Sequence, residues 1–420
     1  MRLGGYDSVE SASKIVPNGK AHPMGDLYTG NGGHSKIRPC VGGGRYRRWG
    51  SFVSLWAFIF SCSLAHGEAL ESAQFPSLVS SLKIRGPLRL FDEPVPLNAQ
   101  EVRERLEKEM LLALWDRPQI ILWLKRSRRY LPIIEKLLKA NGVPDDFKYV
   151  AVAESALRPH VGSPKGAIGF WQFTPETGRR YGLRIDDRID ERRSIYASTE
   201  AAIKYFKELY GIFNSWTLAA AAFNMGEHGL MSEILLQGVQ DYYRLYLPLE
   251  TQRYILRILS AKLIFSDPEK YGFKMNKGDF YPPLSTERVE VECLQETPIL
   301  LIAKAAKTDF KVIKDLNPEI RGYSLAPGTY DILIPGGSAK GFPEAFERYQ
   351  KLYQRAKERQ IYTVKEGDNL TAIADKYNIP LPVLIIQNRL DPNQPIHPGD
   401  TLIIAPVDLE PDGPHNPEHP

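Results

Sequence analysis

The chain has 420 residues, of which 43% are hydrophobic and 25% charged, a composition typical of a soluble globular protein with more than one domain. The formal net charge is +4, but residues 1–67 hold eight Lys or Arg and three Asp or Glu, so residues 68–420 sum to −1. No basic stripe follows any predicted helix, and we therefore expect no nucleic-acid partner.

Residues 1–67 are predicted to be a leader that contains a secretory signal. Three arginines precede the apolar run SFVSLWAFIFSCSL at 51–64, which has the length of a signal's hydrophobic region and is short for a spanning helix. Small residues up to Gly67 suit cleavage before Glu68. We expect an exported protein of the periplasm or cell envelope. Membrane association through an uncut signal or a lipidated Cys62 is the alternative.

A mainly helical domain is predicted over 98–275, after an extended lead-in over 68–97. Asn98 and Glu101 have the spacing of a helix-capping pair, and apolar residues recur at helical spacing after them. The same periodicity predicts further helices over 118–128, 131–141, 145–157, 197–211, 215–225 and 249–265.

Two small α+β modules are predicted after this domain. In the first, over 286–336, the strand-like segments RVEVECL and DILIP flank a helical stretch at 298–316. Residues 337–360 combine a Gly-rich linker with a charged helix. Residues 361–406 have the pattern strand, two short helices, strand (βααβ). Residues 407–420, rich in proline and acid, are predicted to be a disordered tail.

One glutamate stands in an unusual place for an ionisable group. In the predicted helix over 145–157, Glu154 falls on the same apolar stripe as Val150 and Leu157. A carboxyl group in such a setting loses solvation, so its pKa is expected to rise. A carboxylic acid that keeps its proton can act as the general acid in glycoside cleavage. The alternative is a solvated side chain at a helix end before Pro159.

Four motifs follow one another from Glu154 onward. Residues 154–183 read ESALRPHVGSPKGAIGFWQFTPETGRRYGL, with an ES pair, a Gly-Ala-x-Gly turn and an aromatic-Gln pair. The segments DERRSIYASTEAAIKYFKELY, LAAAAFNMGEHG and LPLETQRYILRI come next, in that order. Over about residues 115–270, the chain resembles the goose-lysozyme-like (SLT) lytic transglycosylases. The resemblance implies a mainly α, lysozyme-like catalytic domain.

The resemblance also implies a reaction. These enzymes cleave the β-1,4 bond between N-acetylmuramic acid and N-acetylglucosamine in peptidoglycan, and leave a 1,6-anhydro end because the sugar's own 6-hydroxyl replaces water. Glu154 is then the single acid and base. Glycosidases that use water need two carboxylates, and no spacing argument brings Asp186, Asp187, Asp190 or Glu191 opposite Glu154. A water-using muramidase on the same fold and a non-catalytic wall-binding scaffold remain alternatives.

Further positions match the family's substrate-binding residues. Ser163, Asn224 and Glu250 each have a purely structural alternative: a turn serine, a satisfied core amide and an ion pair. Phe223 stands where the family usually has tyrosine, which puts the rate in doubt. The spacing of His, Cys and Asp predicts no metal site, and we expect no cofactor. The residues implied to contact substrate are Ser163, Gln172, Phe173, Asn224, Glu250 and Tyr254.

Residues 361–406 resemble a LysM domain, a module that binds glycans containing N-acetylglucosamine. The matching positions include Tyr362, Asp368 and Asn388. Residues 286–336 look like a degenerate first copy of the LysM domain that lacks the Gly-Asp turn. This copy is expected either to bind sugar or to have a structural role. The expected partners are therefore peptidoglycan glycan strands, held at the catalytic domain and at LysM.

Overall fold

The computed structural model describes residues 76–359, 361–391 and 394–404. The predicted leader, its signal at 51–64 and the tail over 407–420 lie outside these residues. Within the part described, no helix is long and apolar enough to cross a membrane. Three clusters of buried apolar side chains form its cores, drawn mainly from residues 84–273, 291–346 and 362–402.

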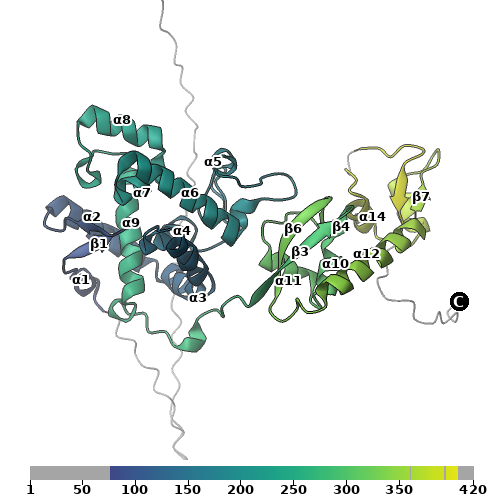
Figure 1. Cartoon of the computed structure of the whole chain (residues 1–420), viewed down its shortest axis with the longest axis horizontal. Coiled ribbons are helices and arrows are strands. Elements are labelled where there is room, and N and C mark those ends of the chain that lie inside the picture. Colours follow the sequence, from purple (N-terminus) through teal and green to yellow (C-terminus); the bar gives the residue numbers. More distant parts are fainter. Residues whose placement is uncertain (1–75, 360, 392–393, 405–420) are drawn as a thin grey trace, which may run out of the picture. The chain divides into compact units, whose positions relative to one another are not determined.

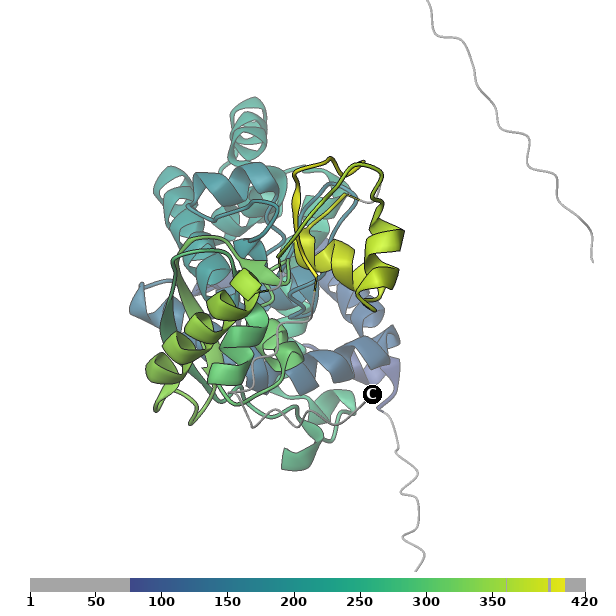
Figure 2. The same ribbon diagram turned by 90° about the vertical axis from the view of Figure 1, so that its right-hand side faces the viewer.

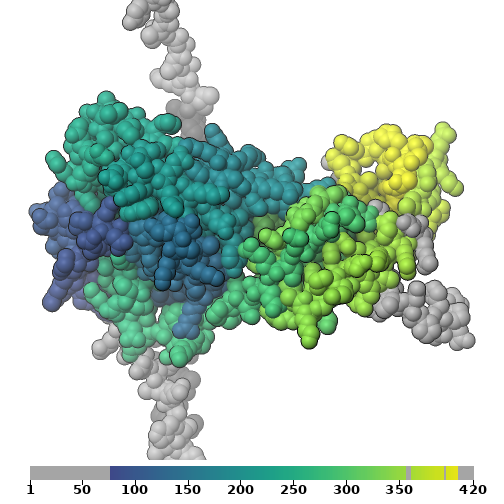
Figure 3. Space-filling view, in the orientation of Figure 1, coloured from purple at the N-terminus to yellow at the C-terminus, as the bar shows by residue number. Residues whose placement is uncertain are grey.

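The first core belongs to a group of helices (Figure 1). Apolar positions recur every three or four residues along the longer helices, so each turns one face inward. In the space-filling view of Figure 3, segments far apart in sequence pack directly against one another. The helices are α2 (Gln100–Trp115), α3 (Arg117–Ala140), α4 (Lys148–Ser155), α5 (Pro175–Arg180), α6 (Ile195–Phe213), α7 (Trp216–Met225), α8 (Glu227–Gln237) and α9 (Leu249–Ser266).

Helix α7 is buried over most of its length. Its four alanines at 219–222 are fully buried, and their small side chains let α7 pack closely against α6 and α9. Its first turn is capped twice. The hydroxyl of Ser215 accepts from the N–H of Leu218, and the carboxylate of Glu93 accepts from the N–H groups of Trp216 and Thr217. The helix that carries Asn224 is therefore fixed at its start.

Helix α3 differs from the prediction of two helices over 118–128 and 131–141. It is one helix, and Pro132 lies inside it. The proline has no N–H to donate, which removes one helix hydrogen bond. Leu131 and Ile134 are buried on either side of it, and this packing maintains the helix through the proline.

Two further helix predictions were wrong or missing. Helix α2 begins at Gln100 with Ala99 as its N-cap and has no side-chain cap, so the predicted Asn98 cap is not formed. Helices α5 and α8 were not predicted. The first has six residues, and the second buries Leu230 alone along its length, so neither presents an apolar stripe to the sequence pattern.

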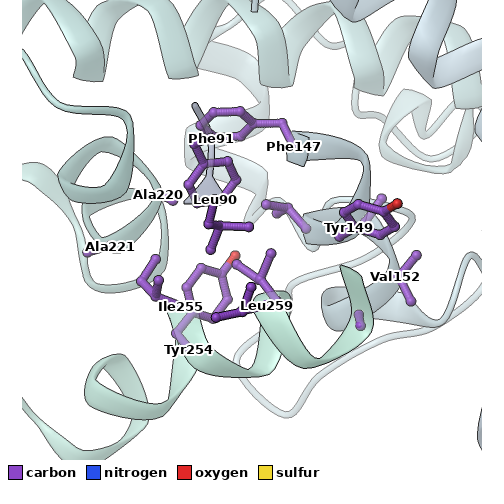
Figure 4. Close-up of a cluster of buried hydrophobic side chains, with 14 of the residues drawn as sticks. Leu90, Phe91, Phe147, Tyr149, Val152, Ala220, Ala221, Tyr254, Ile255 and Leu259 are labelled. Carbon is purple, nitrogen blue, oxygen red and sulfur yellow. The ribbon is translucent and has the colours of Figure 1, made fainter. Parts of the chain in front are cut away.

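The predicted extended lead-in over 68–97 is instead folded into the helical core from residue 76 onward. Leu90 and Phe91 at a hairpin turn are fully buried, and the Phe91 ring lies 4.3 Å from that of Phe147 (Figure 4). Strands of three residues are too short to show a clear alternation, so the sequence pattern missed them. The elements are α1 (Leu78–Ser81), β1 (Leu88–Leu90) and β2 (Glu93–Val95), the two strands being antiparallel.

Two α+β modules follow, as the fold class predicts. The second has the order βααβ, and the first has one additional short strand on each side of its two helices. In the first, β3 pairs antiparallel with β6, and in the second β7 pairs antiparallel with β8. Figure 2 shows the second module in yellow, with its two helices beside its strands. The elements are β3 (Thr286–Cys293), β4 (Thr297–Pro298), α10 (Ile299–Ala305), α11 (Phe310–Leu316), β5 (Ser324–Leu325), β6 (Gly328–Pro335), α12 (Phe342–Arg359), β7 (Ile361–Thr363), α13 (Leu370–Lys376), α14 (Leu381–Asn388) and β8 (Thr401–Ile403).

An asparagine closes each module in the same way. Asn317 donates to the carbonyl of Leu333 and accepts from its N–H, and Asn388 does the same with Ile403. Each asparagine also donates to the carbonyl four residues earlier in its helix. The first module therefore has the same internal link between second helix and last strand as the second module.

Candidate active site

Glu154 lies at the C-terminal end of α4, where the backbone leaves the helix abruptly. The two residues after Ser155 are Ala156 and Leu157, with φ angles of 54° and 58°. Left-handed backbone costs a residue with a side chain about 1–2 kcal/mol. Both side chains are buried, and their packing stabilises the left-handed backbone conformation. The helix thus ends at Ser155, one residue after Glu154, and strain of this kind is common beside functional groups.

The carboxyl group of Glu154 contacts helix α9. The hydroxyl of Tyr254 donates to Glu154 Oε1 over 2.6 Å. The ring of Tyr254 is fully buried, and Figure 4 shows it among Leu90, Ile255 and Leu259. Burial raises the pKa of Glu154, while the hydrogen bond from Tyr254 acts in the opposite direction. Because the net change is upward, Glu154 keeps its proton to a higher pH than an exposed glutamate does.

Two charged residues of helix α9, Arg257 and Glu250, also act on Glu154. Arg257 Nη2 lies 3.1 Å from Glu250 Oε1, and the Arg257 guanidinium is 5.5 Å from the centre of the Tyr254 ring. The positive charge of Arg257 lowers the pKa of Glu154 and the negative charge of Glu250 raises it. The side chain of Glu250 is exposed and makes the ion pair that the sequence left as its structural alternative.

The loop after α4 carries Ser163 and folds back on itself. The N–H of Ser163 donates to the carbonyl of Ala167, and the Ser163 hydroxyl accepts from the N–H of Ala167. Gly169 has a φ of 86°, and a Cβ atom there would lie 1.8 Å from the carbonyl oxygen of Arg192. Only glycine fits at this position, because both the backbone angle and the neighbouring chain exclude a side chain.

Gln172 lies at the end of this loop with a φ of 51°. Its side-chain amide donates to the carbonyl of Val161 over 3.1 Å and to the carbonyl of Gly169 over 2.9 Å. The amide nitrogen of Gln172 thus ties together the two ends of the loop that holds Ser163.

The expectation for Phe173 needs correction. We expected its side chain to contact substrate, but it is 2% exposed and packs in the core, with its ring 5.8 Å from Phe223. Phe173 follows an ordinary core pattern in which Phe170 and Trp171 are also buried. Phe223, which stands where the family usually has tyrosine, also contacts Phe206 at 4.7 Å between ring centres.

Asn224 is fixed from α9. The hydroxyl of Thr251 donates to Asn224 Oδ1 over 2.9 Å. Thr251 is buried and stands one turn before Tyr254 on the same helix. Helix α9 therefore positions both Glu154 and Asn224, through Tyr254 and Thr251.

The acidic segment at 186–191 is used for ion pairs. Asp186 pairs with Arg184, and the buried Asp190 pairs with Arg192. The ionisable groups that act on the pKa of Glu154 are Tyr254, Arg257 and Glu250, so the segment at 186–191 is not among them. Within the part of the chain that the structure describes, no group of three or more His, Cys, Asp or Glu is placed to hold a metal ion.

Two parts of the sequence match the models of known protein domains. Residues 132–245 match the model of the transglycosylase SLT domain, and residues 362–405 match that of the LysM domain. The chain carries an SLT domain and a LysM domain. Glu154, Ser163, Gln172 and Asn224 lie inside the SLT match, whereas Tyr254, which holds Glu154, lies after its end.

Several proteins are similar to this chain. It is 28% identical over 296 residues to the membrane-bound lytic murein transglycosylase D of Escherichia coli K12, a stretch that covers 67% of this chain and 64% of the relative, just under two thirds of its length. It is 30% identical over 117 residues to a putative tributyltin chloride resistance protein of Alteromonas, covering 27% of this chain and 56% of the relative. It is 38% identical over 101 residues to the peptidoglycan transglycosylase gp16 of phage T7, covering 23% of this chain and 8% of the relative.

Two residues of the candidate site, Arg192 and Arg257, were missed by sequence reasoning. Arg257 follows Tyr254 by three residues and so lies on the same side of α9, a spacing that could have identified it. Arg192 contacts Gly166, in the loop that holds Ser163, from 26 residues further along the chain, and no local pattern could have found it.

Proposed function

We propose that this protein is a peptidoglycan lytic transglycosylase with Glu154 as its single acid and base. The observation that carries the proposal is the setting of Glu154, a carboxyl group whose pKa is raised by burial and whose orientation is fixed by Tyr254. The SLT domain and the names of the E. coli and phage relatives support peptidoglycan as the substrate.

In the first step, Glu154 donates its proton to the oxygen between the two sugars. The bond from C1 of N-acetylmuramic acid to O4 breaks, and N-acetylglucosamine leaves with a new 4-hydroxyl. The Glu154 carboxylate then takes the proton of the 6-hydroxyl of N-acetylmuramic acid while O6 bonds to C1. Glu154 ends protonated, no water is consumed, and the product has a 1,6-anhydro end.

The local contacts of Glu154 fit this double role. Tyr254 fixes Oε1, which leaves Oε2 as the oxygen that carries the proton to the substrate. When Glu154 is ionised, the hydrogen bond from Tyr254 and the charge of Arg257 stabilise the carboxylate. The acid therefore has support in both of its protonation states.

We propose Ser163, Gln172 and Asn224 as the substrate-binding residues around Glu154. Ser163 and Gln172 belong to one internally bonded loop, and Asn224 is held by Thr251. Sugar N-acetyl groups offer one donor and one acceptor, which amide side chains match well. Glu250 and Tyr254 act through Arg257 and Glu154.

The second module gives the enzyme a hold on its substrate. We propose that LysM at 361–406 binds glycan containing N-acetylglucosamine and so raises the local concentration of strands at the catalytic domain over 98–275. An enzyme of this kind works in the cell envelope, and the E. coli relative is named as membrane-bound. We propose export by the signal at 51–64 and a location in the periplasm.

The test is mass spectrometry of the products released from purified peptidoglycan. The parent protein is compared with Glu154→Gln, which cannot donate a proton, and with Glu176→Gln, a matched change at an exposed glutamate of the same domain. Anhydro-terminated products from the parent and from Glu176→Gln, with a loss of about 100-fold or more in Glu154→Gln, are the expected result.

Two other outcomes would decide for the alternatives. Products with reducing ends would mean a muramidase that uses water, with Glu250 as the carboxylate to test next. No products from a well-folded parent, together with retained binding to the wall, would mean a binding scaffold.

A further inference from the structure

The buried pair of Asp190 and Arg192 holds the loop that carries Ser163 and Gln172. Arg192 bonds both oxygens of Asp190, through Nε at 2.8 Å and Nη2 at 2.9 Å, and both side chains are almost completely buried. The remaining nitrogen of Arg192, Nη1, donates to the carbonyl of Gly166 over 2.8 Å and to that of Phe173 over 3.2 Å. One guanidinium therefore fastens the loop on both sides of Gln172.

The main chain of Arg192 also packs against the loop. A Cβ atom on Gly169 would lie 1.8 Å from the carbonyl oxygen of Arg192, so the two chains are in direct contact. The loop over 162–173 is therefore gripped at Gly166, Gly169 and Phe173 by Arg192, and its position depends on where residues 188–193 are held.

The first LysM-like module holds that segment. The N–H of Asp190 donates to the carbonyl of Glu319, and the N–H of Arg321 donates to the carbonyl of Arg188, both over 2.8 Å. Between these bonds Ile189 is bridged to Ile320, in the antiparallel sense.

Ile189 is also part of the module's own apolar core. It is 4% exposed and belongs to the same cluster of buried side chains as Ile302 and Ile332. A side chain of the catalytic domain thus completes the core of the module, in addition to the main-chain bonds.

We propose that the module over 286–336 is a brace for the active site, which positions Ser163 and Gln172 through Ile189, Asp190 and Arg192. This rests on the proposed function only in that the loop is taken to bind substrate. It gives the degenerate module a task that needs no glycan binding. Asp190 and Arg192 are positioning residues, since they act on the substrate through the loop.

The test uses the whole protein and the variant Ile189→Asp, which places a charge in the module's core and leaves the loop unchanged. Leu294→Asp is the matched control, because Leu294 is an exposed apolar residue of the same module, 80% accessible. Two quantities are measured: hydrogen exchange of the amides at 162–173, and kcat and KM on soluble, uncross-linked peptidoglycan strands.

A brace predicts a specific kinetic change. In Ile189→Asp the loop is expected to be in its substrate-binding position for about a tenth of the time, so KM rises about tenfold. The value of kcat does not change, because bound substrate holds the loop in that position at saturation. Amides at 162–173 exchange faster in Ile189→Asp, and Leu294→Asp behaves like the parent. Arg192→Lys replaces the planar guanidinium, which bonds Asp190 and the loop at once, with a single ammonium group. We expect the same rise in KM in this variant, although its contacts with the module are unchanged.

Unchanged loop exchange and unchanged KM in both Ile189→Asp and Arg192→Lys would overturn the proposal. So would a fall in kcat at constant KM with a lower melting temperature, because that signifies fewer folded molecules. If the parent releases no products, the proposed function fails, but hydrogen exchange of the loop still decides for or against the brace.

Discussion

The hydroxyl of Tyr254 donates to Oε1 of Glu154 over 2.6 Å, between two residues 100 positions apart in the chain. Helices α4 and α9 pack against each other, and the bond forms at the point where α4 ends. The acid is thus oriented by a phenol that is itself fully buried. Changes at Tyr254 should therefore affect the protonation of Glu154 directly.

Replacing Tyr254 with phenylalanine should move the pH dependence of the reaction upward. The hydroxyl stabilises the ionised form of Glu154, so its loss raises the pKa further, and the falling alkaline limb of kcat/KM shifts to higher pH. The rate at the optimum should fall roughly 10- to 100-fold, since a hydrogen bond to a charged group contributes about 1.5–3 kcal/mol. A pH profile identical to that of the parent would contradict this role.

The ion pair of Glu250 and Arg257 predicts two shifts of opposite sign. Arg257→Met removes a positive charge that lowers the pKa of Glu154, so the alkaline limb moves up. Glu250→Gln removes a negative charge that raises this pKa, so the limb moves down. Both shifts should shrink at high salt, because the pair is partly exposed. Parallel pH profiles of the two variants check the signs, and shifts in the same direction would refute the assignment.

Gly169 and Gly166 form a matched pair for the loop. Both have positive φ, of 86° and 76°, but a Cβ on Gly169 would strike the carbonyl of Arg192, while a Cβ on Gly166 meets nothing within 4 Å. We expect Gly166→Ala to cost about 1–2 kcal/mol of stability. Gly169→Ala should cost clearly more and abolish cleavage. Urea unfolding and product release measure both effects, and equal behaviour of the two variants would show that the contact with Arg192 is unimportant.

The two modules should depend on their asparagines to different degrees. Asn317 is fully buried, so Asn317→Ala leaves the polar groups of Leu333 without partners, at about 1–3 kcal/mol each. Asn388 is partly exposed, and water can replace its bonds to Ile403. Thermal unfolding should therefore show a larger loss for Asn317→Ala. A larger loss for Asn388→Ala would contradict this.

The sequence was most informative where one helix face is buried or a motif is local. The periodicity around Glu154 predicted the raised pKa, and burial is the cause the structure gives. The βααβ order of the second module was also predicted correctly, whereas the first module has one additional short strand on each side of its two helices. These features depend on neighbours within a few residues, which a pattern can represent.

The remaining features depend on residues far apart in the chain. The hairpin around Phe91 has strands of three residues, too short for an alternation to be read. The contacts of Arg192 with Gly166 and Phe173 exist only once the chain has folded. Phe173 was assigned to substrate from its place in a motif, and only its burial in three dimensions reveals it as a core residue.

The carboxylate of Glu93 limits how far this protein can be shortened at its N-terminal side without loss of a support for the site. It caps the helix that ends in Asn224, from a hairpin about 40 residues before the SLT match begins at residue 132. Tyr254 reaches Glu154 from beyond the end of that match at residue 245. A protein trimmed to the matched residues would lose both supports, so a fragment that keeps them has to begin before β1 and end after α9. It has to continue to residue 336 to keep the proposed brace as well.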